Sequence, residues 1–127
     1  MVLLDTHAFL WWIGGDDRLS ERAADLIRDP DTQVFVSAAS VWEIAIKAAD
    51  GRINLLDPPD TYIPRQMEAN SFRGLAIQFH HALGVQTLPV IHRDPFDRLL
   101  VAQAIAEDLT LITRDPQIAR YDVRVAW

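Results

Sequence analysis

The sequence contains no cysteine, which excludes a disulfide framework and any thiolate chemistry. No apolar run approaches the roughly 18 to 20 residues that a membrane-spanning helix needs, so we expect no membrane segment. The opening stretch MVLLDTHAF has no basic residue ahead of its apolar part, which argues against a secretory signal. These absences are compatible with a reducing cytosol, and we expect a cytoplasmic protein.

Positive charge is also scarce. The chain has 12 Lys and Arg residues and 18 Asp and Glu residues, which gives a net charge of −6, and Lys47 is the only lysine. A protein that holds nucleic acid by phosphate neutralisation alone should be basic. If the substrate is a nucleic acid, part of the negative charge must therefore lie in a pocket that cations neutralise.

What the sequence does contain is typical of a folded domain. The chain has 127 residues, half of them hydrophobic, with no repeat, low-complexity tract or linker. This length suits a single domain spanning residues 1–127, with enough apolar side chains for a hydrophobic core.

Apolar patterns and turn residues predict strands that alternate with helices. The expected strands are 2–4, 33–37, 75–79, 110–113 and 123–126. The expected helices or helical turns are 6–13, 20–28, 40–50, a segment near 60–70, 80–86, 94–109 and 115–121. This alternation predicts an α/β fold with a mainly parallel central sheet flanked by helices, in which functional residues gather beyond the carboxyl ends of the strands.

The helix over 40–50 carries the most detailed expectations. Ser40 and Glu43 have the S-x-x-E spacing of a capping box, and Gly51 follows as a stop. Its predicted buried face consists of Trp42, Ala45, Ile46 and Ala49.

The same helical spacing predicts different environments for the tryptophans. It places Trp12 and Trp42 in the core. Trp11 falls on another face of its helix, where an exposed aromatic side chain would be free to meet a partner.

Acidic residues follow the predicted strands at comparable positions. Asp5 follows the first strand, Asp115 follows 110–113, Glu43 lies one turn into a helix, and Asp94 and Asp97 open the long helix. Carboxylates brought together at one sheet edge repel each other unless some protonate or a cation binds. Mg²⁺ and Mn²⁺ prefer such oxygen ligands.

Each acid also has a structural interpretation. Asp94-Pro95 and Asp115-Pro116 both have the signature of a helix N-cap followed by proline. Glu43 and Lys47 form an i,i+4 pair in the favourable order. Asp5 is the hardest to explain structurally, because it ends an apolar strand in a position that should be largely buried. The residues alone leave capping and ligation open.

Four stretches, taken together, resemble the PIN-domain ribonucleases, and among them the VapC-type toxins of bacterial toxin–antitoxin pairs. They are LLDTHAFLWW at 3–12, SAASVWEIAIKAADGRI at 37–53, HRDPFDRLLVAQA at 92–104 and LTLITRD at 109–115. They follow the family's order from end to end of the chain, and the match is weakest over 54–90.

The resemblance implies a PIN-like three-layer sandwich and a metal-dependent endoribonuclease that hydrolyses RNA with a metal-activated water. It assigns Asp5, Glu43, Asp97 and Asp115 to the catalytic metal site, which would hold Mg²⁺ or Mn²⁺, and leaves Asp94 as a cap. Thr113 and, more weakly, Ser37 match hydroxyl positions beside that site. The implied partners are an RNA substrate, a cognate antitoxin protein and a second copy of the chain, with no membrane.

Other polar residues near these stretches do not alter this interpretation. We expect His7, His80, His81 and His92 to have structural or rim roles, because the carboxylates already supply ligands for a hard ion. Whether Arg93, Arg98 or Arg114 contacts RNA phosphate or only offsets local negative charge is left open.

The alternative function is a catalytically silent PIN-like or receiver-like Mg²⁺-binding interaction module. A receiver needs paired acids after the first strand and a late lysine, whereas LLDTH supplies one acid there and Lys47 is early. A haloacid dehalogenase-type phosphatase needs D-x-D, and position 7 is histidine.

Overall fold

A computed structural model describes all 127 residues. Its centre is a five-stranded sheet in the order β3-β2-β1-β4-β5, with every neighbouring pair parallel. The strands are β1 (Val2–Leu4), β2 (Val34–Ser37), β3 (Arg73–Leu75), β4 (Thr110–Ile112) and β5 (Val125–Ala126). The expected α/β fold with a parallel sheet is confirmed.

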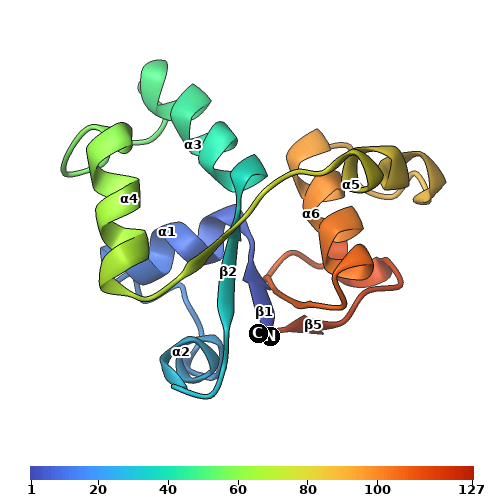
Figure 1. Ribbon diagram of the computed structural model, residues 1–127, viewed down its shortest axis with the longest axis horizontal. Helices are drawn as coiled ribbons and strands as arrows, with labels where there is room; N and C mark the ends of the chain where they lie inside the picture. The colour runs from blue at the N-terminus through green and yellow to red at the C-terminus, as the bar shows by residue number, and fades with distance from the viewer.

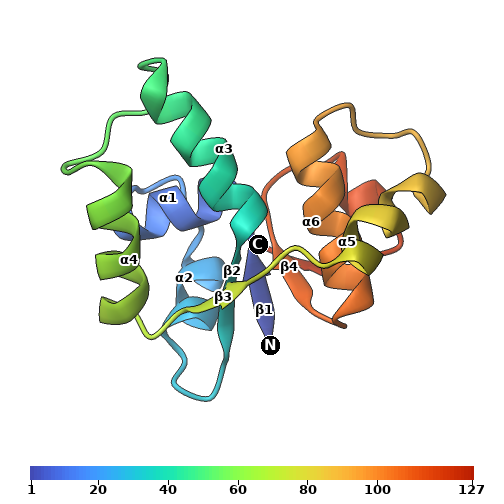
Figure 2. The ribbon, with the colours of Figure 1, turned by 45° about the horizontal axis from the view of Figure 1, so that its top comes forward.

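Helices cover both faces of this sheet. They are α1 (Thr6–Gly14), α2 (Glu21–Arg28), α3 (Ala38–Ala49), α4 (Pro59–Ala69), α5 (Phe79–Gly84) and α6 (Pro95–Ala106), with 3₁₀ turns η1 (Val85–Thr87) and η2 (Ile118–Arg120). Helices α1, α2 and α4 lie on one side and α5 and α6 on the other, which makes three layers (Figures 1 and 2). None of the helices combines the length and the apolar character needed to cross a bilayer.

Alternation along the strands fills two apolar clusters. In β1, Val2 and Leu4 face the cluster that contains Phe9 of α1. Leu3 points the other way, into the cluster that contains Leu100 of α6. Because successive strand residues point to opposite faces, a three-residue apolar strand anchors both layers and fixes where the chain emerges at Asp5.

The expected cap at Asp94 is confirmed, and Ser20 and Gly15 mark the ends of two other helices. The Ser20 hydroxyl accepts a hydrogen bond from the backbone N–H of Ala23 at 3.1 Å. The Asp94 carboxylate caps α6 by accepting from the N–H groups of Phe96 and Asp97 at 2.8 and 3.2 Å. Gly15 ends α1 with φ of 62°, a conformation that glycine adopts without steric cost.

The strand expected over 75–79 is displaced. The structure places β3 at Arg73–Leu75, paired with β2 from Phe35↔Arg73 to Ser37↔Leu75. The more apolar run that follows is not part of the sheet. Hydrogen bonding to β2 sets the limits of this edge strand, and hydrophobicity alone does not reveal that register.

The predicted buried face of α3 is wrong. Trp42 is 57% exposed and Ile46 39% exposed, and Ala45 and Ala49 are exposed too. The face that packs inward carries Ala39, Ser40, Glu43 and Ile44. Helical periodicity favours the more apolar face of α3, whereas the buried face includes Ser40 and Glu43, whose side chains hydrogen-bond with Thr6 of α1.

The capping box on α3 is also absent. The helix begins earlier than expected, and Ser37 is its N-cap, with its hydroxyl accepting from the N–H of Ala39 at 3.0 Å. Ser40 is therefore inside the helix. Its hydroxyl hydrogen-bonds with the Thr6 hydroxyl at 3.0 Å.

The expectation for Trp11 is reversed as well. Its side chain is only 8% exposed and packs edge-on against Trp127, with ring centroids 5.8 Å apart. Trp12 is partly buried against the core, and its indole N–H donates to Asn70 at 2.9 Å. Residues distant in sequence cover Trp11, so helical spacing within α1 could not show its burial.

Candidate metal centre

Asp5 lies where β1 ends and α1 begins. One carboxylate oxygen accepts from the N–H of Ala8 at 2.8 Å, which makes Asp5 the N-cap of α1. The residue is only 5% exposed. Burial raises the pKa of Asp5, while hydrogen bonds from the Thr113 side chain and from Ala8 lower it. A negative charge in this position is costly without a cation.

Asp97 lies in the first turn of α6, three residues after the cap Asp94. Burial, followed by the neighbouring charge of Asp94, raises the pKa of Asp97 to about 7, although His92 opposes the shift. Asp5 and Glu43 add smaller contributions in the same upward direction. Asp97 is thus held among carboxylates that disfavour its charged form.

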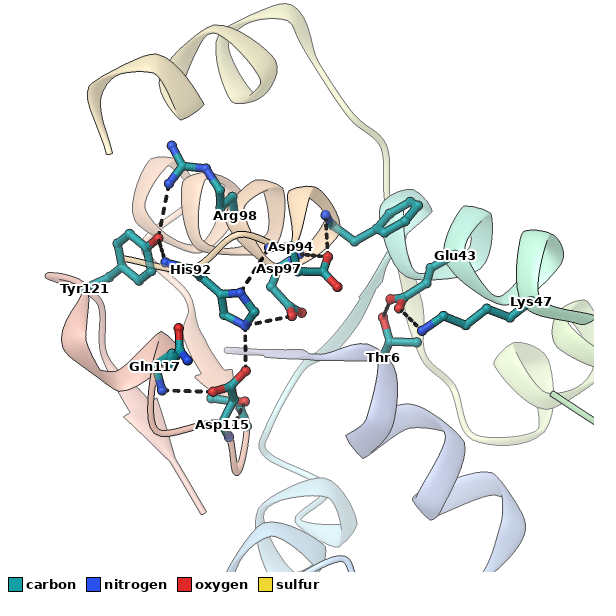
Figure 3. Close-up of polar contacts among 12 residues, drawn as sticks. Thr6, Glu43, Lys47, His92, Asp94, Asp97, Arg98, Asp115, Gln117 and Tyr121 are labelled. Carbon is teal, nitrogen blue, oxygen red and sulfur yellow. Dashed lines mark hydrogen bonds and ion pairs between the residues drawn. The ribbon is translucent and has the colours of Figure 1, made fainter. Parts of the chain in front are cut away.

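His92 joins Asp97 to Asp115, which follows β4. Its Nε2 lies 2.7 Å from Oδ2 of Asp115 and 3.2 Å from Oδ2 of Asp97 (Figure 3). Its Nδ1 accepts from the N–H of Asp94 at 3.1 Å, so Nε2 carries the ring proton and donates. Ligand atoms of these three residues all lie within 4.8 Å of one another.

Three of the four predicted acids line one pocket. Its volume is about 410 Å³, and its lining includes Asp5, Asp97 and Asp115. The rest of the lining is mainly polar and consists of His7, Trp11, Arg18, His92, Arg114 and Pro116. The carboxyl ends of β1 and β4 and the start of α6 meet here, as the rule for parallel sheets requires.

Glu43 lies apart from this cluster. Its carboxylate accepts from the Thr6 hydroxyl at 2.7 Å and from Lys47 at 2.6 Å (Figure 3). It is 5% exposed and does not line the acidic pocket. Its charge nevertheless acts on Asp97. The only lysine of the chain therefore balances the fourth acid.

The two predicted hydroxyl residues occupy different positions. Thr113 is buried beside the pocket, where it bonds to the Asp5 side chain and accepts from the N–H of Asp115 at 3.0 Å. Ser37 caps α3 and donates to the side chain of Gln103, away from the pocket lining.

The arginines that flank the acids also differ. Arg98 donates to the carbonyl oxygens of Pro89 and Val85, at 3.0 and 3.2 Å, and to the Tyr121 hydroxyl at 3.2 Å. These bonds tie α6 to the preceding loop, which is a structural role. Arg93 and Arg114 are exposed, and Arg114 lines the acidic pocket.

A second cluster of potential ligands, His80, His81 and Glu107, lies between α5 and α6. His81 is fully buried, and its Nε2 lies 2.7 Å from Glu107. Its Nδ1 accepts from the N–H of Gln78 at 2.9 Å, so Nε2 is the protonated nitrogen. This bonding supports a structural role for His81, as the sequence analysis expected.

Sequence reasoning missed the central place of His92 and the presence of Arg18 and Trp11 in the pocket. One signal was available for His92, because it precedes the cap Asp94 by two residues and so lies close to Asp97. Its contact with Asp115 crosses 23 residues of sequence and depends on the sheet. Arg18 follows α1 and gave no comparable signal.

The donor set fits a hard divalent cation. Burial raises the pKa of Asp5 and of Asp97 and so disfavours their charged forms when no cation is bound. Asp115 adds a third carboxylate in the same pocket. Mg²⁺ and Mn²⁺ bind through oxygen ligands of this kind and would relieve the repulsion.

Comparison with known proteins agrees with this arrangement. Residues 2–124 match the PIN domain family. The chain belongs to the PIN domain family. This PIN domain is 35% identical to Ribonuclease VapC22 of Mycobacterium tuberculosis over 118 residues, covering 92% of this chain and 88% of the relative.

Solved structures share the PIN fold at lower sequence identity. The VapBC2 structure from Rickettsia felis, bound to a promoter DNA fragment, matches with a TM-score of 0.72 and 13% identity, covering 100% of this chain and 99% of that one. The DNA-bound VapBC structure from Salmonella typhimurium matches with a TM-score of 0.71 and 15% identity, covering 99% and 98%.

Proposed function

We propose that this PIN domain protein is a metal-dependent endoribonuclease that acts as the toxin of a toxin–antitoxin pair. The observation that carries the proposal is the convergence of Asp5, Asp97 and Asp115 in one pocket at the carboxyl edge of the sheet. The 35% identity to a protein named as a ribonuclease supports the choice of RNA as substrate.

We assign Asp5, Asp97 and Asp115 as the residues that hold Mg²⁺ or Mn²⁺, and Glu43 as a neighbouring acid outside the pocket lining whose charge acts on Asp97. Such an ion, when bound, lowers the pKa of a water molecule and stabilises negative charge on phosphoryl oxygens. No nucleophilic side chain is needed, which agrees with a chain that lacks cysteine.

The surrounding residues set the state of these acids. His92 donates to Asp115 and so orients that carboxylate, and its Nε2 also lies 3.2 Å from Oδ2 of Asp97. Thr113 bonds to Asp5 from the end of β4. Asp97, whose pKa is about 7, must be deprotonated to bind a cation. Lys47 neutralises Glu43 from one side.

The proposal includes an antitoxin protein as partner, a homodimer, and the cytoplasm as the compartment. Support for the antitoxin comes from the VapBC structures, and from a toxin–antitoxin complex from Klebsiella pneumoniae, which share this fold. The net charge of −6 favours a partner that presents basic side chains to this protein.

The test is cleavage of total RNA by the purified chain with Mn²⁺, with Mg²⁺ and with EDTA, alongside Asp97→Asn. Asp31→Asn is the matched control, because Asp31 is exposed, lies in the loop before β2 and makes no side-chain hydrogen bond. We expect discrete fragments from the parent and Asp31→Asn with either metal. Fragments from Asp97→Asn at the parent rate would contradict the proposal.

A further inference from the structure

The acidic pocket has a wall of opposite charge. The Arg114 guanidinium lies 4.6 Å from the centre of the Trp11 ring, and that of Arg18 lies 5.0 Å from it. His7 stacks on Trp11, with ring centroids 5.4 Å apart. All four residues line the pocket together with the three carboxylates. A buried tryptophan thus carries two arginines at the mouth of the acidic pocket.

The two guanidinium groups differ in how they are bonded. Arg18 is held by Asp16, with Nη2 2.7 Å and Nε 3.1 Å from its carboxylate oxygens. The Arg114 guanidinium donates no hydrogen bond to a protein group and forms no salt bridge, although Arg114 directly precedes Asp115 in the chain. Its charge acts at longer range on Asp16, whose pKa it helps Arg18 to lower.

This bonding argues against simple charge balance. A residue that served only to neutralise the pocket would pair with one of its carboxylates, as Lys47 does with Glu43. A residue that served only the fold would donate to carbonyl groups, as Arg98 does. Arg114 does neither, and its planar fork of N–H donors stays available for a ligand.

We propose that Arg114, supported by Trp11 and flanked by Arg18, binds a backbone phosphate of the RNA. The next phosphate along the same strand lies at the three carboxylates of the acidic pocket. The inference rests on the proposed ribonuclease function. A phosphodiester strand that crosses the pocket meets carboxylates, where cations bind, and then guanidinium groups, where an anion binds directly. Stacking on Trp11 restricts the arginine before the ligand arrives and so reduces the entropy lost on binding.

The experiment measures kcat and KM for whichever RNA the parent protein cleaves, using Arg114→Ala, Arg114→Lys and the control Arg22→Ala. Arg22 is exposed on α2 and makes no side-chain hydrogen bond or salt bridge. We expect Arg114→Ala to raise KM about tenfold with little change in kcat, because one phosphate contact is lost. The KM of Arg114→Lys should lie between those of the parent and Arg114→Ala, because lysine keeps the positive charge but loses the planar stack on Trp11.

Two further readouts separate this role from a structural one. The dependence of log(kcat/KM) on log salt should become less steep by about 0.7 in Arg114→Ala, the value for one contact to a single strand. Mn²⁺ affinity and thermal stability should match those of Arg22→Ala.

Three results would overturn the inference. The first is a KM for Arg114→Ala equal to that of Arg22→Ala while the parent cleaves RNA, which would leave the proposed function intact. The second is a loss of Mn²⁺ binding or of stability in Arg114→Ala, which would assign Arg114 to the fold. The third is no cleavage by the parent, which would remove the proposed function as well.

Discussion

At the scale of single residues, Asp97 shows how the site is prepared for a cation. Its carboxyl is in the first turn of a helix, where negative charge is usually favoured. Burial and the charges of Asp94, Asp5 and Glu43 outweigh that preference and raise its pKa to about 7. In the metal-free protein, the protonated form of Asp97 is therefore favoured below about pH 7.

This raised pKa predicts a pH dependence of stability. A carboxyl whose pKa is higher in the folded state contributes stability that is complete below its ordinary pKa and is lost as pH rises through about 7. In EDTA, the parent should lose up to about 4 kcal/mol of unfolding free energy from this group between pH 4 and pH 8. Asp97→Asn should lack that part of the decline, as measured by urea unfolding at each pH. The prediction fails if Asp97→Asn and Asp31→Asn show the same decline.

At the scale of elements, local signals predicted where helices begin and end better than which face they bury. Asp94, Ser20 and Gly15 act within one turn of their own position, so the sequence could reveal them. The inward face of α3 depends on Thr6, which is 37 residues from Glu43 in sequence. No periodicity within α3 can report such a contact.

The burial of the two tryptophans predicts that substitution by alanine lowers the free energy of unfolding by very different amounts. Trp11→Ala empties a buried position and should lower the free energy of unfolding by about 3 kcal/mol or more. Trp42→Ala removes a largely exposed side chain and should cost less than about 1 kcal/mol, although Trp42 contacts Phe96 edge-on at 5.0 Å. Urea unfolding of both variants measures the difference, and a larger cost at Trp42 would refute the described burial.

Substitution of Ser37 distinguishes a role as the N-cap of α3 from a role in the metal site. Its hydroxyl accepts from Ala39 and donates to Gln103, so Ser37→Ala should cost about 1 to 3 kcal/mol by removing a cap and a buried partner. Because Ser37 does not line the acidic pocket, Mn²⁺ affinity measured by calorimetry should stay at the parent value. A weakened affinity in the folded variant would instead assign Ser37 to the metal site.

At the scale of the whole molecule, parallel strand order determines which acids meet. The alternation of strands and helices predicted the sheet, and the sheet brings residues that follow β1 and β4 to one edge. The pairing of Glu43 with Lys47 was predicted from spacing, whereas its distance from the pocket lining was not. The place of His92 depends on contacts that form only when β4 and α6 are both in position.

A cation that binds the folded state but not the unfolded state raises the free energy of unfolding of the whole domain. At a free Mn²⁺ concentration 100 times the dissociation constant, the free energy of unfolding should rise by about 2.7 kcal/mol. Asp97→Asn should lose most of this gain because it removes a proposed ligand, whereas Asp31→Asn should retain it. Thermal unfolding with and without Mn²⁺ provides the comparison, and equal gains in the two variants would place the cation elsewhere.

The most direct test of the central claim is the end chemistry of the RNA fragments. Attack by a water molecule at the acidic pocket, with the 3′-oxygen as the leaving group, breaks the P–O3′ bond and leaves a 5′-phosphate and a 3′-hydroxyl. Attack by the RNA's own 2′-hydroxyl leaves a 5′-hydroxyl and a cyclic phosphate instead. We predict 5′-phosphate fragments that require Mn²⁺ or Mg²⁺ and are absent with EDTA and with Asp97→Asn. Fragments with 5′-hydroxyl ends, or fragments that persist in EDTA, would contradict the account.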